Sequence, residues 1–194
     1  MSQGDSPKRI KTKLVKGKRS MDYAQELWEV PGGKKIWRDV VKHKGAVAIF
    51  CLRGKGKRLE LLMQYQYRYP YQKNLWEVPA GTMDPGESPQ TTARRELLEE
   101  TGYRAASLRK FGRLLPAPGY CDEVIHLYEA NKLSYVGQEL DEGELIHKVQ
   151  WKPVAQILNW IRSGKIMDAK TVAGVLRMSL SLIHISEPTR LHCI

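Results

Sequence analysis

The sequence predicts an α/β fold of the α+β type, in which helices pack against a sheet. Three features indicate it. Strand-like apolar runs occupy the first third of the chain, a well-capped helix follows, and further strands precede a second amphipathic helix. At 194 residues the chain has room for one domain with a sizeable core and an appendage. We therefore expect a single sheet-based domain.

The first twenty residues are strongly basic. They hold seven lysines and arginines against Asp5, more than half of the chain's net charge of +11. A charged run without interleaved aromatic residues is typical of a solvated tail. We expect residues 1–20 to be disordered and to have no specific nucleic-acid partner.

A hairpin is predicted next, over residues 21–44. Asp22–Val30 and Lys35–Lys42 have strand character, and Pro31-Gly32-Gly33 between them is a turn signal. We expect this small N-terminal β element to mediate dimerisation, while residues 45–179 form the main domain.

The main domain opens with two core strands. Gly45–Leu52 is apolar throughout, which is typical of a buried strand, and Leu59–Tyr67 is a second such run. The first run is far shorter than the ~20 residues that span a bilayer. Three scattered cysteines fit neither a disulfide framework nor a metal site. We expect a cytoplasmic protein without a membrane partner.

A helix is predicted over Pro89–Thr101. Ser88 is a suitable N-cap, proline fits the first helical position, and Gly102 stands where a left-handed C-cap is required. Ala93 and Leu97, one turn apart, are expected to face the core.

The second half continues the pattern. Strands are predicted over Val124–Ala130 and Ile146–Trp151, separated by the acidic loop 139–144. Val154–Ser163 has apolar residues at helical spacing, and 168–178 opens a third helix.

The last fifteen residues have a different character. Leu180–Arg190 reads LSLIHISEPTR, which resembles residue for residue a translation of the transposase end of a common sequencing adapter. We therefore expect residues 180–194 to be adapter read-through and not native sequence.

Three carboxylates share one face of the predicted helix. Glu96 and Glu100 are four residues apart and Glu99 lies between them, so the charges repel. A cation from outside the helix is the natural completion of this face. Hard oxygen ligands suit Mg²⁺ or Mn²⁺, which also bind substrate phosphates.

The spacing around this helix is that of a known motif. Gly81, Glu87, Arg95-Glu96-Leu97, Glu99-Glu100 and Gly102 stand at the positions of the Nudix box, which the sequence resembles throughout. The resemblance implies a Nudix-fold α/β/α sandwich. It also implies metal ligation by Glu96 and Glu100, joined by Glu99 or by the backbone carbonyl of Ala80, with Glu99 also a catalytic candidate. Glu87 and Arg95 are expected to pair structurally.

Flanking segments narrow the resemblance. Gln66–Pro70, Trp76–Gly81 and Pro116–Glu123 are similar to the ADP-ribose pyrophosphatase branch of the family, and Pro118, fifteen residues past the box, is the mark of that branch. Arg68 is the candidate for binding phosphate, because a guanidinium fits its oxygens bidentately. Glu77 is expected to bind either a ribose hydroxyl or the neighbouring backbone.

The resemblance also implies a shared site. In this branch the N-terminal element is commonly exchanged across a homodimer, and Trp37 stands where some relatives have an aromatic residue that covers the nucleobase in the partner's site. Packing in a small core or in a subunit contact is the alternative for Trp37 and Trp28.

The general base is expected in the acidic loop. In the resembling branch it is a glutamate just before a late strand; Glu142, beside Gly143, is the first candidate and Glu144 the rival. An acidic loop that is only solvated is the third alternative.

The expected reaction is hydrolysis of ADP-ribose to AMP and ribose 5-phosphate. The alternatives are another nucleotide sugar such as GDP-mannose, a non-catalytic ligand-binding module and an RNA pyrophosphohydrolase. A non-catalytic module usually loses box carboxylates, whereas this chain keeps them, and the Pro118 region disfavours RNA.

Overall fold

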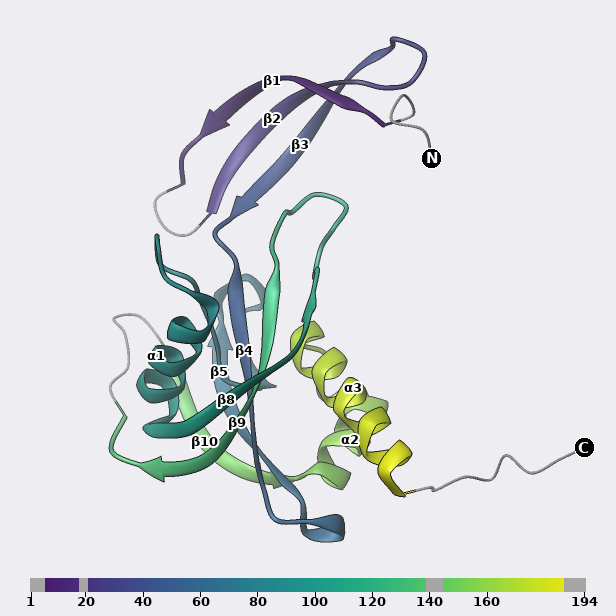
Figure 1. The fold of residues 1–194 in the computed structure, drawn as a ribbon. Helices are drawn as coiled ribbons and strands as arrows, with labels where there is room; N and C mark the ends of the chain where they lie inside the picture. Colours follow the sequence, from purple (N-terminus) through teal and green to yellow (C-terminus); the bar gives the residue numbers. More distant parts are fainter. Residues whose placement is uncertain (1–5, 18–20, 139–144, 187–194) are drawn as a thin grey trace, which may run out of the picture.

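The computed structural model describes residues 6–17, 21–138 and 145–186, with side chains described as far as Ser179. It has a main sheet between helices and a separate N-terminal sheet (Figure 1). Helix α1 (Pro89–Thr101) covers one face of the main sheet, while α2 (Val154–Arg162) and α3 (Ala169–Ser186) cover the other. The predicted α/β/α sandwich is confirmed.

The main sheet has seven strands. Its path runs β10-β5-β4-β9-β8, with β6 paired to β5 and β7 to β4. Only the β4–β9 pair is parallel among the described pairings. The strands are β4 (Ala46–Arg53), β5 (Glu60–Arg68), β6 (Lys73–Glu77), β7 (Ala80–Thr82), β8 (Tyr103–Leu114), β9 (Ile125–Tyr135) and β10 (Ile146–Pro153). Two short 3₁₀ turns occupy Gly56–Arg58 and Tyr69–Tyr71.

Strand β4 explains the two-layer core. Because side chains alternate along a strand, Ala48 and Phe50 point into one cluster, with Ile157 of α2 and Val175 of α3. Val47, Ile49 and Cys51 point into the other, with Ala93 and Leu97 of α1. The apolar run at 46–52 is thus buried on both faces, as its composition predicted.

The N-terminal sheet has one strand more than predicted. The expected hairpin is present as β2 (Met21–Glu29) and β3 (Lys35–His43), but β1 (Lys8–Val15) pairs along β2 within the expected disordered tail. Disorder over 1–20 is therefore wrong for residues 8–15. Alternating lysines with Ile10, Thr12 and Leu14 suit a solvated edge strand, which charge alone did not reveal.

Buried Glu26 ties this sheet together. Its carboxylate accepts from Arg9 at 3.0 Å and Lys42 at 2.9 Å, and from the Trp28 indole at 3.1 Å. Burial raises the pKa of Glu26, but these cations outweigh it and the pKa falls below its usual value. Lys42 also binds Asp122, which joins this sheet to the loop after β8.

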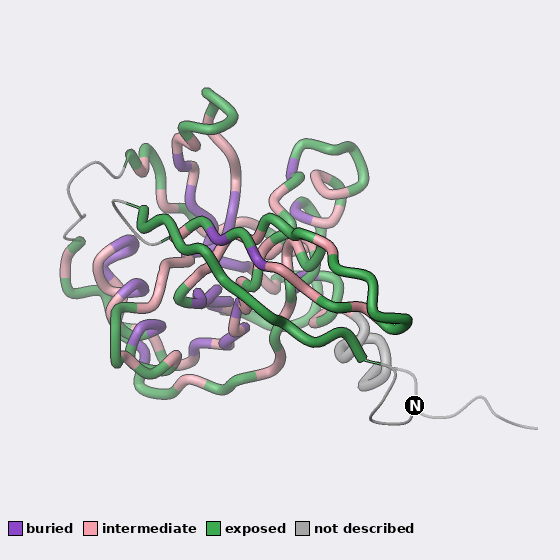
Figure 2. Tube along the Cα trace, turned by 90° about the horizontal axis from the view of Figure 1, so that it is seen from above, coloured by how far each residue is buried: buried purple, intermediate pink, exposed green. Residues whose placement is uncertain are grey.

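Burial differs between the two sheets. Figure 2 shows most of the N-terminal sheet exposed, while most buried segments lie in the main domain.

Helix α3 runs past the expected adapter junction, to Ser186. Its backbone does not test whether residues 180–194 are native. No helix in the described part of the chain is long and apolar enough to cross a membrane.

Candidate active site

The acidic helix is fixed by its caps and its core face. The Thr91 amide donates to Ser88 Oγ at 3.2 Å, and Gly102 has φ +74° with its amide on the Leu98 carbonyl at 2.8 Å. Ala93 and Leu97 are fully buried, as predicted. This orientation turns Glu96 and Glu100 toward the β6–β7 connection.

Glu100 is bound to that connection. Its Oε2 accepts from the Ala80 amide at 2.8 Å, and its Oε1 accepts from Gln64 Nε2 at 3.2 Å. Glu100 is 1% exposed and Glu96 7%. Two of the predicted metal ligands therefore lie against Ala80 and Gly81, which were predicted from the same motif.

Arg95 neutralises much of the acidic face. Its Nη1 donates to Glu96 Oε1 at 2.9 Å and to Glu99 Oε2 at 3.0 Å. The sequence indicated a cation from outside the helix as the completion of this face, and it did not reveal that Arg95, on the helix itself, also binds two of the carboxylates.

The predicted pair of Glu87 and Arg95 is confirmed. Arg95 Nη2 lies 3.0 Å from Glu87 Oε2, and Nε lies 3.1 Å from Oε1. Hydrogen bonds from Arg95 lower the pKa of Glu87 to about 2. This pair holds the loop before α1 against the helix.

The donor set fits a hard divalent ion. Glu96, Glu99 and Glu100 supply carboxylate oxygens, and Gln64 Oε1 is a buried acceptor without a hydrogen-bond partner among the described residues. No described group of three acidic, histidine or cysteine side chains converges as a ready-made ion site. Arg95 binds one oxygen of Glu96 and one oxygen of Glu99.

A pocket of about 270 Å³ opens beside these carboxylates. Arg68 lines it, together with Ala80 and Gly81. The predicted phosphate ligand thus lies next to the predicted metal ligands. The remaining walls come from β4, β7, the loop after β8, the first residue of β9 and the start of α3: Ala46, Val47, Thr82, Pro116, Glu123, Ile125, Asp168, Ala169 and Lys170.

Two predicted substrate ligands, Glu77 and Pro118, are not among the residues that line this pocket. Glu77 is 1% exposed, and its oxygens accept from Arg68 and Lys170. Among the described residues its carboxylate binds these two cations and no backbone group, and a ribose contact stays a prediction. Pro118 lies in an exposed turn after β8, and Pro116 lines the pocket instead.

The third helix was predicted to open at residue 168, but the residues at its start were not assigned to the site. Asp168 accepts from Lys170 at 2.8 Å and from the Thr171 hydroxyl at 2.6 Å, and that hydroxyl lies 3.0 Å from the Val78 amide. Lys170 also pairs with Glu77, ninety-three residues earlier. An Asp-Ala-Lys-Thr stretch at a helix start carries a capping signal, but nothing local indicates its distant partner.

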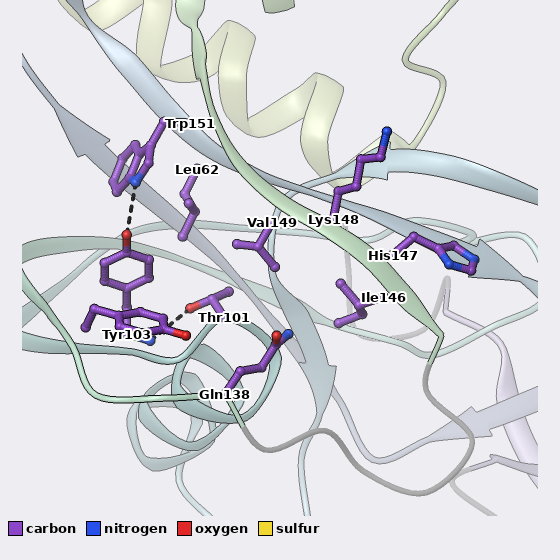
Figure 3. Close-up of a pocket in the computed structure, with 10 residues that line it drawn as sticks. Leu62, Thr101, Tyr103, Gln138, Ile146, His147, Lys148, Val149 and Trp151 are labelled. Atoms are coloured by element: carbon purple, nitrogen blue, oxygen red, sulfur yellow. Dashed lines mark hydrogen bonds between the residues drawn. The ribbon is translucent and has the colours of Figure 1, made fainter.

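A second pocket, of about 260 Å³, lies in the gap between β8 and β10 (Figure 3). Strands β8 and β10 are the two edge strands at opposite ends of the sheet order. Even so, Trp151 Nε1 of β10 donates to Tyr103 Oη of β8 at 3.2 Å. The sheet therefore curls around α1. Gln138 and Ile146 line this pocket and flank the loop of Glu142 and Glu144, which themselves lie outside the described residues.

Trp37 lies away from the pocket of its own chain. It stands on β3, is 53% exposed and pairs in register with Leu27. Packing in a small core does not describe it. Trp28 is half-buried and bonded to Glu26.

Comparison with known proteins decides the family. A model of the NUDIX domain matches residues 42–172. The chain belongs to the Nudix family. It is 37% identical over 172 residues to an ADP-ribose pyrophosphatase of Bacillus subtilis, covering 88% of this chain and 90% of that protein.

Other Nudix relatives carry different names. A methanol dehydrogenase activator of Bacillus methanolicus is 36% identical over 175 residues, covering 89% and 92% of the two chains. A crystal structure of an ADP compounds hydrolase superposes with a TM-score of 0.77 at 21% identity, covering 93% and 96%. That likeness supports the fold.

Proposed function

We propose that this Nudix enzyme hydrolyses the diphosphate bond of ADP-ribose, giving AMP and ribose 5-phosphate, with Mg²⁺ or Mn²⁺. One observation carries the proposal: a pocket lined by Arg68 and Lys170 adjoins the acidic face of α1. A metal-bound diphosphate needs two kinds of group. Cationic side chains bind its free oxygens, and carboxylates bind the divalent metal that it coordinates. The name of the Bacillus subtilis relative supports the choice of substrate.

The metal is assigned to Glu96, Glu99 and Glu100 together with the Ala80 carbonyl. A bound divalent ion supplies charge neutralisation and a lower pKa for the attacking water. Arg68 is assigned to a phosphate oxygen. Its Nε and Nη2 are bonded to Glu77, while Nη1 has no partner among the described residues and remains available to a ligand.

The proton of the attacking water is assigned to Glu142, with Glu144 as the rival. Both belong to the loop between Gln138 and Leu145, outside the described residues. Replacement of the true base by Gln should lower kcat by about 10²–10⁴-fold while substrate still binds. Measuring both variants at saturating Mg²⁺ distinguishes them, and full activity in both would mean that another group, or a metal-bound hydroxide alone, activates the water.

We further infer a cytoplasmic homodimer built through the N-terminal sheet. That sheet exposes apolar side chains at Ile10, Leu14, Tyr23 and Trp37. Exposed apolar surface on one sheet favours association with a second copy. Trp37 is then free to cover the nucleobase in the partner's pocket.

Turnover of a nucleotide-sugar panel tests the proposal. ADP-ribose, GDP-mannose and a capped or triphosphorylated RNA are offered with Mg²⁺, and products are separated by chromatography. The proposal predicts the highest kcat/KM for ADP-ribose with AMP as product. Preference for GDP-mannose would keep the reaction and change the substrate, and binding without turnover would indicate the non-catalytic module.

A further inference from the structure

Four charged side chains of alternating sign form a cluster at the active-site pocket, in which Arg68, Lys170 and Asp168 line the pocket and Glu77 is buried. Arg68 donates to Glu77, Lys170 bridges Glu77 and Asp168, and Asp168 caps α3 through the Thr171 amide at 3.0 Å. The four charges sum to zero. A cluster of this kind costs desolvation energy, so its retention beside an open pocket calls for an explanation.

Arg68 ends this chain of charges at the pocket. Its Nε lies 2.7 Å from Glu77 Oε1 and its Nη2 lies 2.6 Å from Oε2, so the guanidinium plane is fixed by two parallel bonds. The third nitrogen, Nη1, makes no hydrogen bond with the residues that the structure describes, and we assign it to a ligand. Orientation of Arg68 therefore depends on where the carboxylate of Glu77 is held.

Lys170, which also lines the pocket, binds that carboxylate as well. Its side chain is 11% exposed and its ammonium contacts both Glu77 and Asp168. Sharing Glu77 with a second cation also reduces how far Glu77 cancels the charge of Arg68. Burial lowers the pKa of Lys170, but the two carboxylates outweigh it and the pKa stays raised, so the ammonium is charged.

We propose that Lys170 is a positioning residue, which acts through Glu77 to aim Arg68 at a phosphate of the substrate. This role rests on the proposed hydrolysis of a nucleotide diphosphate. It differs from general support of α3, because its effect passes through one side chain, Arg68.

A double-mutant cycle isolates that path. Lys170→Met leaves each acid a donor, since Glu77 keeps Arg68 and Asp168 keeps Thr171, so the fold is expected to persist. It should raise KM for ADP-ribose about tenfold with a smaller change in kcat. Lys170→Arg should restore most of the loss. In an Arg68→Met background, Lys170→Met should raise KM for ADP-ribose by less than about twofold.

Lys165→Met is the matched control, because Lys165 lies over the Trp160 ring and outside the pocket. It should leave KM unchanged. Additive effects in the cycle, or an unchanged KM in Lys170→Met, would overturn the positioning role. If Lys170→Met lowers the melting temperature and kcat together without the Arg68 dependence, the role is only structural.

Failure of the proposed function is distinguishable. The same double-mutant cycle is repeated without turnover by measuring, with calorimetry, how each variant binds inorganic pyrophosphate in the presence of Mg²⁺. Tenfold weaker binding in Lys170→Met, absent in the Arg68→Met background, supports the positioning role even where ADP-ribose is not hydrolysed. Equal binding by all variants overturns it.

Discussion

Gly81 lies beneath the carboxylate of Glu96. A Cβ on Gly81 would overlap the Cδ and both carboxylate oxygens of Glu96. Strand β7 therefore contacts the acidic face through bare backbone, and the reason for glycine at this position of the Nudix box is steric.

Gly81→Ala should displace Glu96 and weaken metal binding. We expect the Mg²⁺ concentration for half-maximal activity to rise and kcat to fall by about tenfold or more. A Mg²⁺ titration of activity checks this, with thermal unfolding as the control for folding. An unchanged Mg²⁺ dependence would show that Glu96 need not occupy this position.

The ion pair of Glu87 with Arg95 should make the stability of the fold depend on pH. Because Arg95 lowers the pKa of Glu87 from 4.5 to about 2, the pair stabilises the fold above pH 4.5, and that contribution is lost as the pH falls toward 2. Glu87→Gln should therefore lower the melting temperature at neutral pH. The difference from wild type should shrink below pH 4.5. A difference that stays constant down to pH 2 would contradict the assignment.

Trp37 separates the shared-site dimer from a chain that works alone. Stacking on a base is worth about 1–3 kcal/mol, so Trp37→Ala should raise KM by roughly ten- to a hundredfold with less effect on kcat. Its melting temperature should change little because the side chain is exposed. Trp28→Ala, which removes a bond to Glu26, should lower stability instead. An unchanged KM in Trp37→Ala would remove Trp37 from the site.

Truncation tests the adapter hypothesis. A chain ending at Ser179 keeps buried Val175 and should retain its melting temperature and turnover. Helix α3 continues to Ser186, so the truncated chain lacks about two turns of this helix. A fall of several degrees would mean that residues beyond 179 pack against the domain.

Local patterns predicted most of the fold. Helix α1 begins and ends where Ser88 and Gly102 indicate, because caps are local signals. Strands β1, β6, β7 and β8 were not predicted. In β1 the lysines hid the alternation, and β8 is irregular, with a register shift between Lys110 and Gly112.

The site was predicted only where one motif holds it. The box placed Glu96 and Glu100, and the Glu87–Arg95 pair followed from the same spacing. Lys170 and its pairing with Glu77 depend on how α3 packs against β6, and no local pattern contains that contact.

Replacement of the acidic pair is the most direct test of metal-dependent hydrolysis. ADP-ribose turnover with Mg²⁺ is measured for Glu96→Gln and Glu100→Gln, with Glu60→Gln, a surface partner of Arg53, as the matched control. The account predicts that kcat falls by at least ~10²-fold in the first two and stays unchanged in the third, with all three folded. Near-normal turnover in both Glu96→Gln and Glu100→Gln would contradict it.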